Sequence, residues 1–359
     1  MSCLLSCASH AEAATTLNRI SHIVVLYLEN HSFDNLLGDF PGSNNLSRAG
    51  QTTTQRDRGG RAYIVLPNPE GPFDVDGNPP DVRSIALGEL PNRPFAIDAV
   101  SPSVSIRTVT RGLTHLFYTN RAQINGGAND RFALLSDARG FTMGYYSATA
   151  MKQTNLWKAA RDGVLFDNFF QGGFGGSFFN HMWLVCSCAP LWPNPPADQR
   201  SVVDAEGIPV HERRVTAAPD GDYAVNTTQS VFLNDGKQEG ALLPAQSSTS
   251  IGDRLSERGV DWAWYSEGWN LAIDQQRTPE QQQQLDSMLF AYHHQPFAYF
   301  RRFDPTTAKG RADRRIHLRD AQDLEIDIRS GQLPPVTFFK PADVRSEHPG
   351  LGSVAAGMQ

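Results

Sequence analysis

Apolar residues gather in short runs along the chain, and each run is followed by a polar or glycine-rich turn. The first run, 23–28 (IVVLYL), is unbroken rather than alternating, which predicts a strand buried on both faces. Comparable runs occupy 164–170 (VLFDNFF), 260–265 (VDWAWY) and 336–339 (VTFF). Runs of this length between turn signals predict further strands.

Helical stretches lie between these runs. Residues 251–258 predict a helix that ends at Gly259, and residues 318–330 predict another that ends at Gly331. The alternation of strands and helices favours an α/β fold with a mostly parallel central sheet flanked by helices. In such sheets, binding sites lie beyond the carboxyl ends of the strands.

The domain organisation is predicted from two less regular stretches. Residues 192–248 are rich in proline, aspartate and glycine, which predicts a looped insertion or cap within one domain over 15–359, and we expect this domain to be incomplete at its C-terminus. Residues 1–14 end in Ala11-Glu12-Ala13, which fits the cleavage pattern of a secretory signal. We therefore expect a signal-peptide remnant and an exported protein, periplasmic or secreted. A disordered N-terminus and a lipoprotein site at Cys7 are the alternatives.

Composition argues against two classes of function. A net charge of −6 with scattered positive residues offers no basic surface to nucleic acid. No apolar run approaches the ~18 residues of a membrane span, so we expect no transmembrane segment. Cys186 and Cys188 are expected to be too close to bridge each other and to be small buried residues.

Glu29 and Asn30 directly follow the first apolar run. A carboxylate and an amide oxygen at the carboxyl end of a strand suit a divalent cation, whose identity the sequence does not specify. The alternative is that Asn30 or Ser32 only caps a helix that begins at Phe33.

Four glycines in 172–176 (GGFGG) precede Ser177, which opens a predicted helix to about Val185. A hydroxyl at a helix N-terminus lies among free N–H groups, where a phosphoryl group can be held. A cation-bound serine there would ionise readily and attack. The alternative is a helix cap after a flexible loop.

Histidines form the third element of the predicted site. Phosphoryl transfer needs donor groups around the phosphoryl oxygens and an acid for the leaving group. Each histidine alone is more commonly an ordinary residue, and the adjacent pair before Gln295 is the least typical of a loop. The candidates are His115, His181, His293, His294 and His348.

Several segments together resemble one known family. Residues 29–38 (ENHSFDNLLG) are similar to the opening motif of the bacterial phosphoesterase family that contains acid phosphatases and phospholipases C. The resemblance continues, in the same order and over nearly the whole chain, through 115–118 (HLFY), 123–127 (QINGG), 144–146 (GYY), 174–181 (FGGSFFNH), 293–297 (HHQPF) and 347–350 (EHPG). It implies a core fold like that of alkaline phosphatase.

The resemblance also implies roles for individual residues. Glu29 and Asn30 would be metal ligands, and Ser177 would be the metal-bound nucleophile that forms a phosphoserine. The phosphoryl site would be lined by His115, Asn180, His294 and His348, with His293 beside them. The substrate would be a small phosphate ester or a phospholipid. A serine nucleophile is closer to the acid phosphatases than to the phospholipases, and a charged histidine acid implies an acidic optimum.

One departure from the family pattern changes the expectation. Family members carry an aspartate-rich metal motif after the His-Pro-Gly segment, and these 359 residues contain none. We therefore expect weak metal binding, slow turnover and an exposed sheet edge. The alternatives to an acid phosphatase are a phospholipase C acting on phosphodiester lipids and a catalytically impaired phosphate- or ligand-binding protein.

Overall fold

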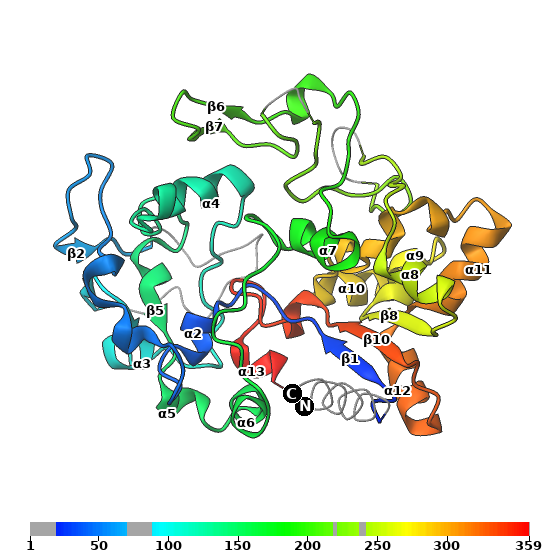
Figure 1. The fold of residues 1–359 in the computed structure, drawn as a ribbon, viewed down its shortest axis with the longest axis horizontal. Coiled ribbons are helices and arrows are strands. Elements are labelled where there is room, and N and C mark those ends of the chain that lie inside the picture. Colours follow the sequence, from blue (N-terminus) through cyan, green and yellow to red (C-terminus); the bar gives the residue numbers. More distant parts are fainter. Residues whose placement is uncertain (1–18, 70–87, 218–220, 237–241, 359) are drawn as a thin grey trace, which may run out of the picture.

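The computed structural model describes residues 19–69, 88–217, 221–236 and 242–358 (Figure 1). The predicted signal-peptide remnant lies outside these residues and stays a prediction. The strands are β1 (Ile23–Leu26), β2 (Val65–Leu66), β3 (Leu90–Pro91), β4 (Phe95–Ala96), β5 (Gly144–Tyr145), β6 (Val202–Val203), β7 (Pro209–His211), β8 (Trp262–Ser266), β9 (Leu318–Arg319) and β10 (Val336–Lys340). The α-helices are α2 (Phe33–Leu37), α3 (Ile97–Val100), α4 (Phe117–Ile124), α5 (Ala148–Met151), α6 (Asn155–Asp162), α7 (Ser177–Cys186), α8 (Ile251–Glu257), α9 (Trp269–Ile273), α10 (Pro279–Met288), α11 (Ala308–His317), α12 (Ala321–Ser330) and α13 (Val354–Gly357).

A parallel sheet in the order β1-β10-β8-β9 forms the centre of the fold. Strand β8 is buried along its whole length, and helices α8, α11 and α12 pack against it. Figure 1 shows these helices around the sheet, with α7 crossing beside it. The predicted α/β fold with a mostly parallel sheet and flanking helices is therefore confirmed.

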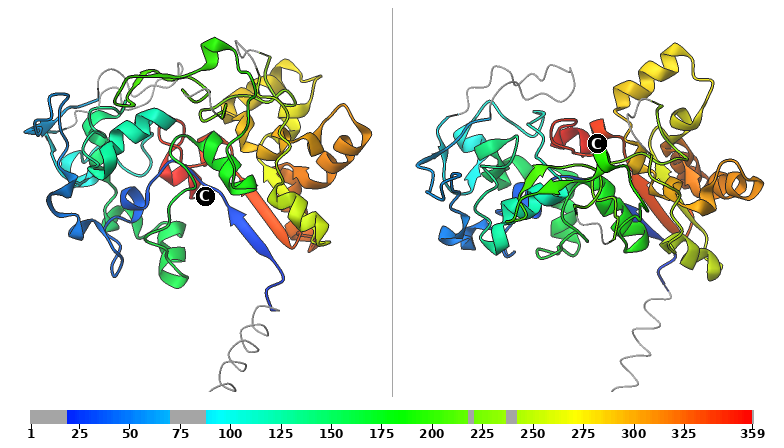
Figure 2. Two further views of the ribbon diagram at one scale, coloured as in Figure 1. Left: turned by 45° about the horizontal axis from the view of Figure 1, so that its top comes forward. Right: turned by 90° about the horizontal axis from the view of Figure 1, so that it is seen from above.

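Two hydrophobic clusters stabilise the fold. One joins the sheet to α7, with the fully buried Trp262 and Trp264 packed among aromatic residues such as Phe178 and Phe297. The other lies under the helices α2–α6, where Leu90 and its neighbours are buried. Figure 2 shows these helices gathered to one side of the sheet and the helices α8 to α12 gathered to the other.

Strand β1 corrects the expectation of a strand buried on both faces. Its side chains at Ile23, Val24 and Leu26 are 55%, 47% and 65% exposed. β1 hydrogen-bonds only β10 among the described residues, so it is an edge strand. An unbroken apolar run identifies a strand, but its burial depends on elements that pack on it from elsewhere in the chain. The expectation that a missing strand leaves a sheet edge exposed stays a prediction.

The run 164–170 does not form the strand that its apolar residues predict. It is irregular, and Val164, Phe166, Phe169 and Phe170 are all largely exposed. No described strand offers this segment a partner. Strand formation requires a hydrogen-bonding edge as well as β-forming side chains, and the segment lacks one.

The other predicted helices are present, but the one predicted over 318–330 begins later, because residues 318–319 form β9 and Asp320 caps α12. Helix α8 begins with a capping box between Ser250 and Asp253, and Gly259 follows it in the left-handed region. Gly331 ends α12 in the same conformation, and β10 follows. The helix predicted from Phe33 is α2, and Ser32 caps it by accepting a hydrogen bond from the Asn35 N–H group.

Cys186 and Cys188 form a disulfide with their Cα atoms 5.1 Å apart, so the expectation that they are too close to bridge is wrong. Ser187 between them has φ +48° and ψ +38° and ends α7. This left-handed residue turns the chain and brings the two sulfur atoms together.

The described part of 192–248 holds the antiparallel pair β6–β7, isolated bridges and loops. Its role as an insertion or cap stays a prediction. None of the helices in the described residues is long and apolar enough to cross a membrane.

Candidate active site

The candidate site forms where the carboxyl ends of two parallel strands meet the start of α7. Leu26 of β1 pairs with Phe339 of β10, so Glu29 and Lys340, which follow them in the chain, become neighbours. His293 and His294 reach the same place from the short 3-10 helix Tyr292–His294. The location agrees with the rule that sites in parallel sheets lie beyond the strands' carboxyl ends.

Ser177 is the first residue of α7, as its place after the glycines predicts. Its Oγ lies 2.8 Å from Nε2 of His293. Gly175 has φ +110°, and a Cβ on Gly176 would lie 2.9 Å from the carbonyl oxygen of His115. Both positions therefore require glycine, and the loop passes close to the segment that carries His115.

A cavity of about 390 Å³ opens in front of Ser177. It brings together several residues that the sequence assigns to the site, namely Glu29, Asn30, His115, Ser177 and Asn180. His293 and His294 lie behind this wall, and each contacts one of its residues, Ser177 and Glu29 respectively. The predicted residues thus form one connected group.

Glu29 is the most strongly held group of the site. Its Oε1 lies 2.9 Å from Nε2 of His294 and 3.2 Å from Nζ of Lys340. Burial raises the pKa of Glu29, but the charge of Lys340 and the interaction with His294 outweigh it, and the pKa lies well below its usual value. Burial and the Glu29 charge raise the pKa of Asp343 well above its usual value. Of these two neighbouring carboxyls, Glu29 is therefore the one that ionises more readily.

The buried histidines of the site are neutral near pH 7. Burial lowers the pKa of His181 to about 3 and that of His294 to about 4. Burial and the two neighbouring imidazoles lower the pKa of His293 well below its usual value. Burial also lowers the pKa of His348. These groups are suited to accept a proton or to bind a metal rather than to be the charged acid that the sequence-based argument for an acidic optimum requires.

His348 and His115 lie on the other side of the cavity, with their ring centroids 5.3 Å apart. Nε2 of His348 accepts a hydrogen bond of 2.5 Å from Nδ2 of Asn30, and Nδ1 donates to the Pro349 carbonyl. Both ring nitrogens of His348 are therefore engaged. His115 donates from Nδ1 to the carbonyl of Leu113, and its ring lines the cavity.

Asn180 holds the glycine loop. Its Oδ1 accepts a hydrogen bond of 3.2 Å from the N–H group of Gly173, and its Nδ2 donates to the carbonyl of Gly176. Asn120 supports the same loop by accepting from the N–H group of Gly175. The amide of Asn180 therefore fixes the backbone that surrounds Ser177, and its side chain also lines the cavity.

Lys340 and Asp343 are not among the residues predicted from the sequence, and His181 is predicted only as one of the candidate histidines, without a role. Lys340 ends β10, and Asp343 follows three residues later, so their position at a strand's carboxyl end is a signal that could have identified them. His181 lies one turn after Ser177 on α7, and its Nδ1 donates to the Ser177 carbonyl oxygen. The spacing of four residues places His181 on the same face of the helix as Ser177, and this spacing could also have identified it.

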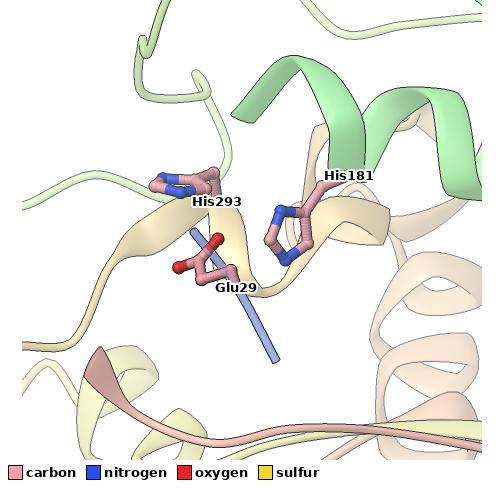
Figure 3. Close-up of side chains that lie close together, drawn as sticks. All are labelled: Glu29, His181 and His293. Atoms are coloured by element: carbon pink, nitrogen blue, oxygen red, sulfur yellow. The ribbon is translucent and has the colours of Figure 1, made fainter. Parts of the chain in front are cut away.

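Among the residues that the structure describes, two groups of side chains are close enough to hold a metal ion. One contains Glu29, His181 and His293 (Figure 3), and the other contains Glu29, His294 and Asp343. Buried carboxylate and imidazole groups are suitable ligands for a divalent cation such as Zn²⁺. Two residues from the predicted ligand set, Asn30 and Ser177, line the adjoining cavity, and each already bonds a histidine. The chemistry of the donor set thus fits a divalent metal.

An α/β sheet with a serine at a helix N-terminus, in a cavity surrounded by histidines, is an arrangement suited to hydrolysis. The chain belongs to the phosphoesterase family, whose sequence model matches residues 20–359. The protein is therefore placed among the hydrolases that act on phosphate esters. Comparison of the sequence with curated proteins finds no match.

Proposed function

We propose that the protein is a phosphomonoesterase of the acid phosphatase type that acts through a phosphoserine on Ser177. The observation that carries this proposal is the contact of 2.8 Å between Ser177 Oγ and His293 Nε2 at the start of α7. A serine hydroxyl bonded to a neutral imidazole is the usual arrangement of an activated nucleophile. A divalent metal at the Glu29 carboxylate would lower the charge on the phosphoryl oxygens.

His293 is the group that accepts the proton of Ser177 in this proposal. Its neutral imidazole takes the hydroxyl proton as Oγ forms a bond to phosphorus and the bond from phosphorus to the leaving oxygen breaks. The N–H groups at the start of a helix have no partner within the helix, and those of Ser177 and Phe178 in α7 would bind the phosphoryl oxygens. Water then attacks the phosphoserine, and inorganic phosphate leaves with the serine hydroxyl restored.

His115 is our candidate for the acid that protonates the leaving alcohol. It lines the cavity, and its Nδ1 donates to the Leu113 carbonyl. Nε2 is therefore the nitrogen that would protonate the leaving group. His348 is less suitable because both of its nitrogens are engaged. A histidine acid gives most activity on the acidic side of neutrality.

The test is hydrolysis of para-nitrophenyl phosphate by the full chain at about pH 6, where a histidine acid is partly charged. We expect Ser177→Ala and a chelator each to abolish turnover. Ser287→Ala, at an exposed position on α10, is the matched control and should keep wild-type activity. Turnover by Ser177→Ala equal to that of the wild type would refute the proposal.

Phospholipase C activity is the second candidate, and a second cavity favours it. This cavity of about 770 Å³ shares Asn30, His31 and Ser32 with the cavity of Ser177. Its wall includes the aromatic residues Phe170 and Phe174, which suit an apolar leaving group. Faster hydrolysis of the para-nitrophenyl ester of phosphocholine than of para-nitrophenyl phosphate would favour this candidate.

A non-catalytic phosphate-binding protein is the remaining alternative. It would bind inorganic phosphate equally well in chelator and would show no turnover that depends on Ser177. Isothermal titration with inorganic phosphate, with and without chelator, separates it from both enzymes.

A further inference from the structure

Helix α4 begins just after His115, the candidate acid of the proposed function. Its N-cap residue is Leu116, whose apolar side chain has no hydrogen-bond acceptor. The first N–H groups of an α-helix have no partner within the helix, and a polar N-cap side chain usually accepts from one of them. Acceptors for the first N–H groups of α4 therefore have to come from elsewhere.

Two side chains of the predicted insertion supply these acceptors. The carboxylate of Glu212 accepts from the Tyr118 N–H group at Oε1 (2.6 Å) and from the Thr119 N–H group at Oε2 (2.9 Å). Oδ1 of Asn226 accepts from the N–H group of Phe117 at 2.9 Å. The first three N–H groups of α4 are thus bound by side chains that lie 93 to 109 positions later in the chain.

Glu212 is the centre of this contact. Its carboxylate also accepts from Oγ1 of Thr119 at 2.7 Å and from Nδ2 of Asn226 at 3.1 Å, so it orders the asparagine as well as the helix. A carboxylate at a helix N-terminus interacts favourably with the positive end of the helix dipole. Asn226 is buried and Glu212 partly buried, so water cannot freely replace these contacts. Removal of Glu212 would release the start of α4.

The loop that precedes Ser177 passes the same place. A Cβ on Gly175 would lie 3.4 Å from Cα of Phe117 and 3.5 Å from the Val225 carbonyl oxygen, so the loop runs between the start of α4 and the predicted insertion. Glu212 directly follows β7, which packs next to α4 (Figure 1). The acid, the loop of the nucleophile and the Glu212 contact therefore form one packed region.

We propose that Glu212 is a positioning residue for hydrolysis, which holds the start of α4 and so keeps the His115 imidazole where it can protonate the leaving group. The inference rests on the proposed function, in which His115 is the acid. The described residues that line the Ser177 cavity include His115 but not Glu212, so Glu212 acts through the backbone rather than on the substrate. A general acid works only within hydrogen-bond reach of the atom that it protonates, and a small displacement lowers the rate strongly.

The test compares two substrates of the full chain, para-nitrophenyl phosphate and phenyl phosphate, which differ only in the nitro group. Para-nitrophenolate is a weak base that leaves with little help, whereas phenolate is a stronger base whose departure depends more on a proton from the acid. The measured quantity is kcat/KM, because it includes the step in which the leaving group departs. Loss of folded protein lowers kcat/KM for both esters by the same factor, so the ratio between them changes only when the acid is displaced.

We expect Glu212→Ala to lower kcat/KM for phenyl phosphate about tenfold more than for para-nitrophenyl phosphate. Glu212→Gln keeps one acceptor oxygen and should change the ratio in the same direction by less. Glu206→Ala is the matched control, because Glu206 is exposed in the turn between β6 and β7, and it should leave the ratio unchanged. Circular dichroism verifies that Glu212→Ala is folded, and if it is not, Glu212→Gln takes its place.

His115→Ala shows whether Glu212 acts through His115. Adding Glu212→Ala to His115→Ala should leave the ratio where His115→Ala alone puts it, since two changes that act through one group are not additive. A wild-type ratio in Glu212→Ala, or a further change of the ratio in the double variant, would overturn the inference, and turnover that depends on Ser177 would leave the proposed function intact. Turnover that does not depend on Ser177 would overturn both.

Discussion

Lys340→Met tests how the charge of Glu29 is held in the interior. The Lys340 ammonium lies 3.2 Å from Glu29 Oε1, and the two side chains are 0% and 4% exposed. Water cannot replace the ammonium, so the variant leaves a buried carboxylate without its cation. Removing one partner of a buried pair costs about 3–5 kcal/mol. We expect the free energy of unfolding to fall by that amount at about pH 7.5, where Glu29 is ionised.

The pH dependence follows from the pKa of Glu29. Burial raises this pKa, and Lys340 and His294 more than offset the effect, so the folded-state pKa lies below the unfolded value of about 4.5. A lowered pKa contributes stability that is present above the unfolded pKa and is lost as the pH falls through the folded pKa. The cost of Lys340→Met is therefore largest near neutrality and shrinks toward pH 4, because the unpaired carboxyl can then be protonated.

Urea unfolding followed by tryptophan fluorescence measures the effect. Lys309→Met is the matched control, because Lys309 lies at the same 3.2 Å from Asp313 but its side chain is 82% exposed. Exposed pairs contribute about 1 kcal/mol or less. The double variant Glu29→Gln/Lys340→Met removes both charges and should recover part of the loss. Equal losses for Lys340→Met and Lys309→Met, or a larger loss at about pH 4.5 than at about pH 7.5, would refute the reasoning.

Two further predictions concern the segments that border the site. Burial raises the pKa of Glu347 from 4.5 to about 7. The free energy of unfolding of the wild type therefore falls as the pH rises from 4.5 to 7. Glu347→Gln should be more stable than the wild type by up to about 3 kcal/mol at about pH 8 and nearly equal to it at about pH 4. Thermal unfolding at the two pH values checks this, and a stability difference independent of pH would contradict it. Gly176→Ala should lower kcat about a hundredfold with little change in secondary structure, because the new Cβ meets the His115 carbonyl oxygen at 2.9 Å and displaces the loop. Gly59→Ala, where the nearest atom is a flexible Asp57 side chain at 3.3 Å, is its control, and equal activity of the two variants would exclude the steric argument.

The sequence predicts the parts of the site that local patterns determine. Ser177 follows a glycine cluster and begins a helix, and Glu29 follows a strand, so both positions are readable from neighbouring residues. The parallel sheet is predictable for the same reason, since β8 and β10 each follow a helix that ends in a characteristic glycine. These features depend on interactions within a few residues.

The features that the sequence misses depend on contacts between distant segments. The pairing of Lys340 with Glu29 follows from the register of β10 against β1, which no local pattern specifies. The exposure of β1 depends equally on what covers it. The Cys186–Cys188 disulfide depends on the left-handed conformation of Ser187, which is rare for a serine. Each case is decided by tertiary geometry or by an uncommon backbone conformation.

The most direct test of the central claim is to trap the covalent intermediate. The protein is mixed with para-nitrophenyl phosphate at about pH 6, denatured in acid during turnover, and examined by mass spectrometry of its peptides. The account predicts one phosphoryl group on Ser177, absent from Ser177→Ala and from a sample without substrate. Turnover with no phosphate on Ser177, or with phosphate on a different residue, would contradict it.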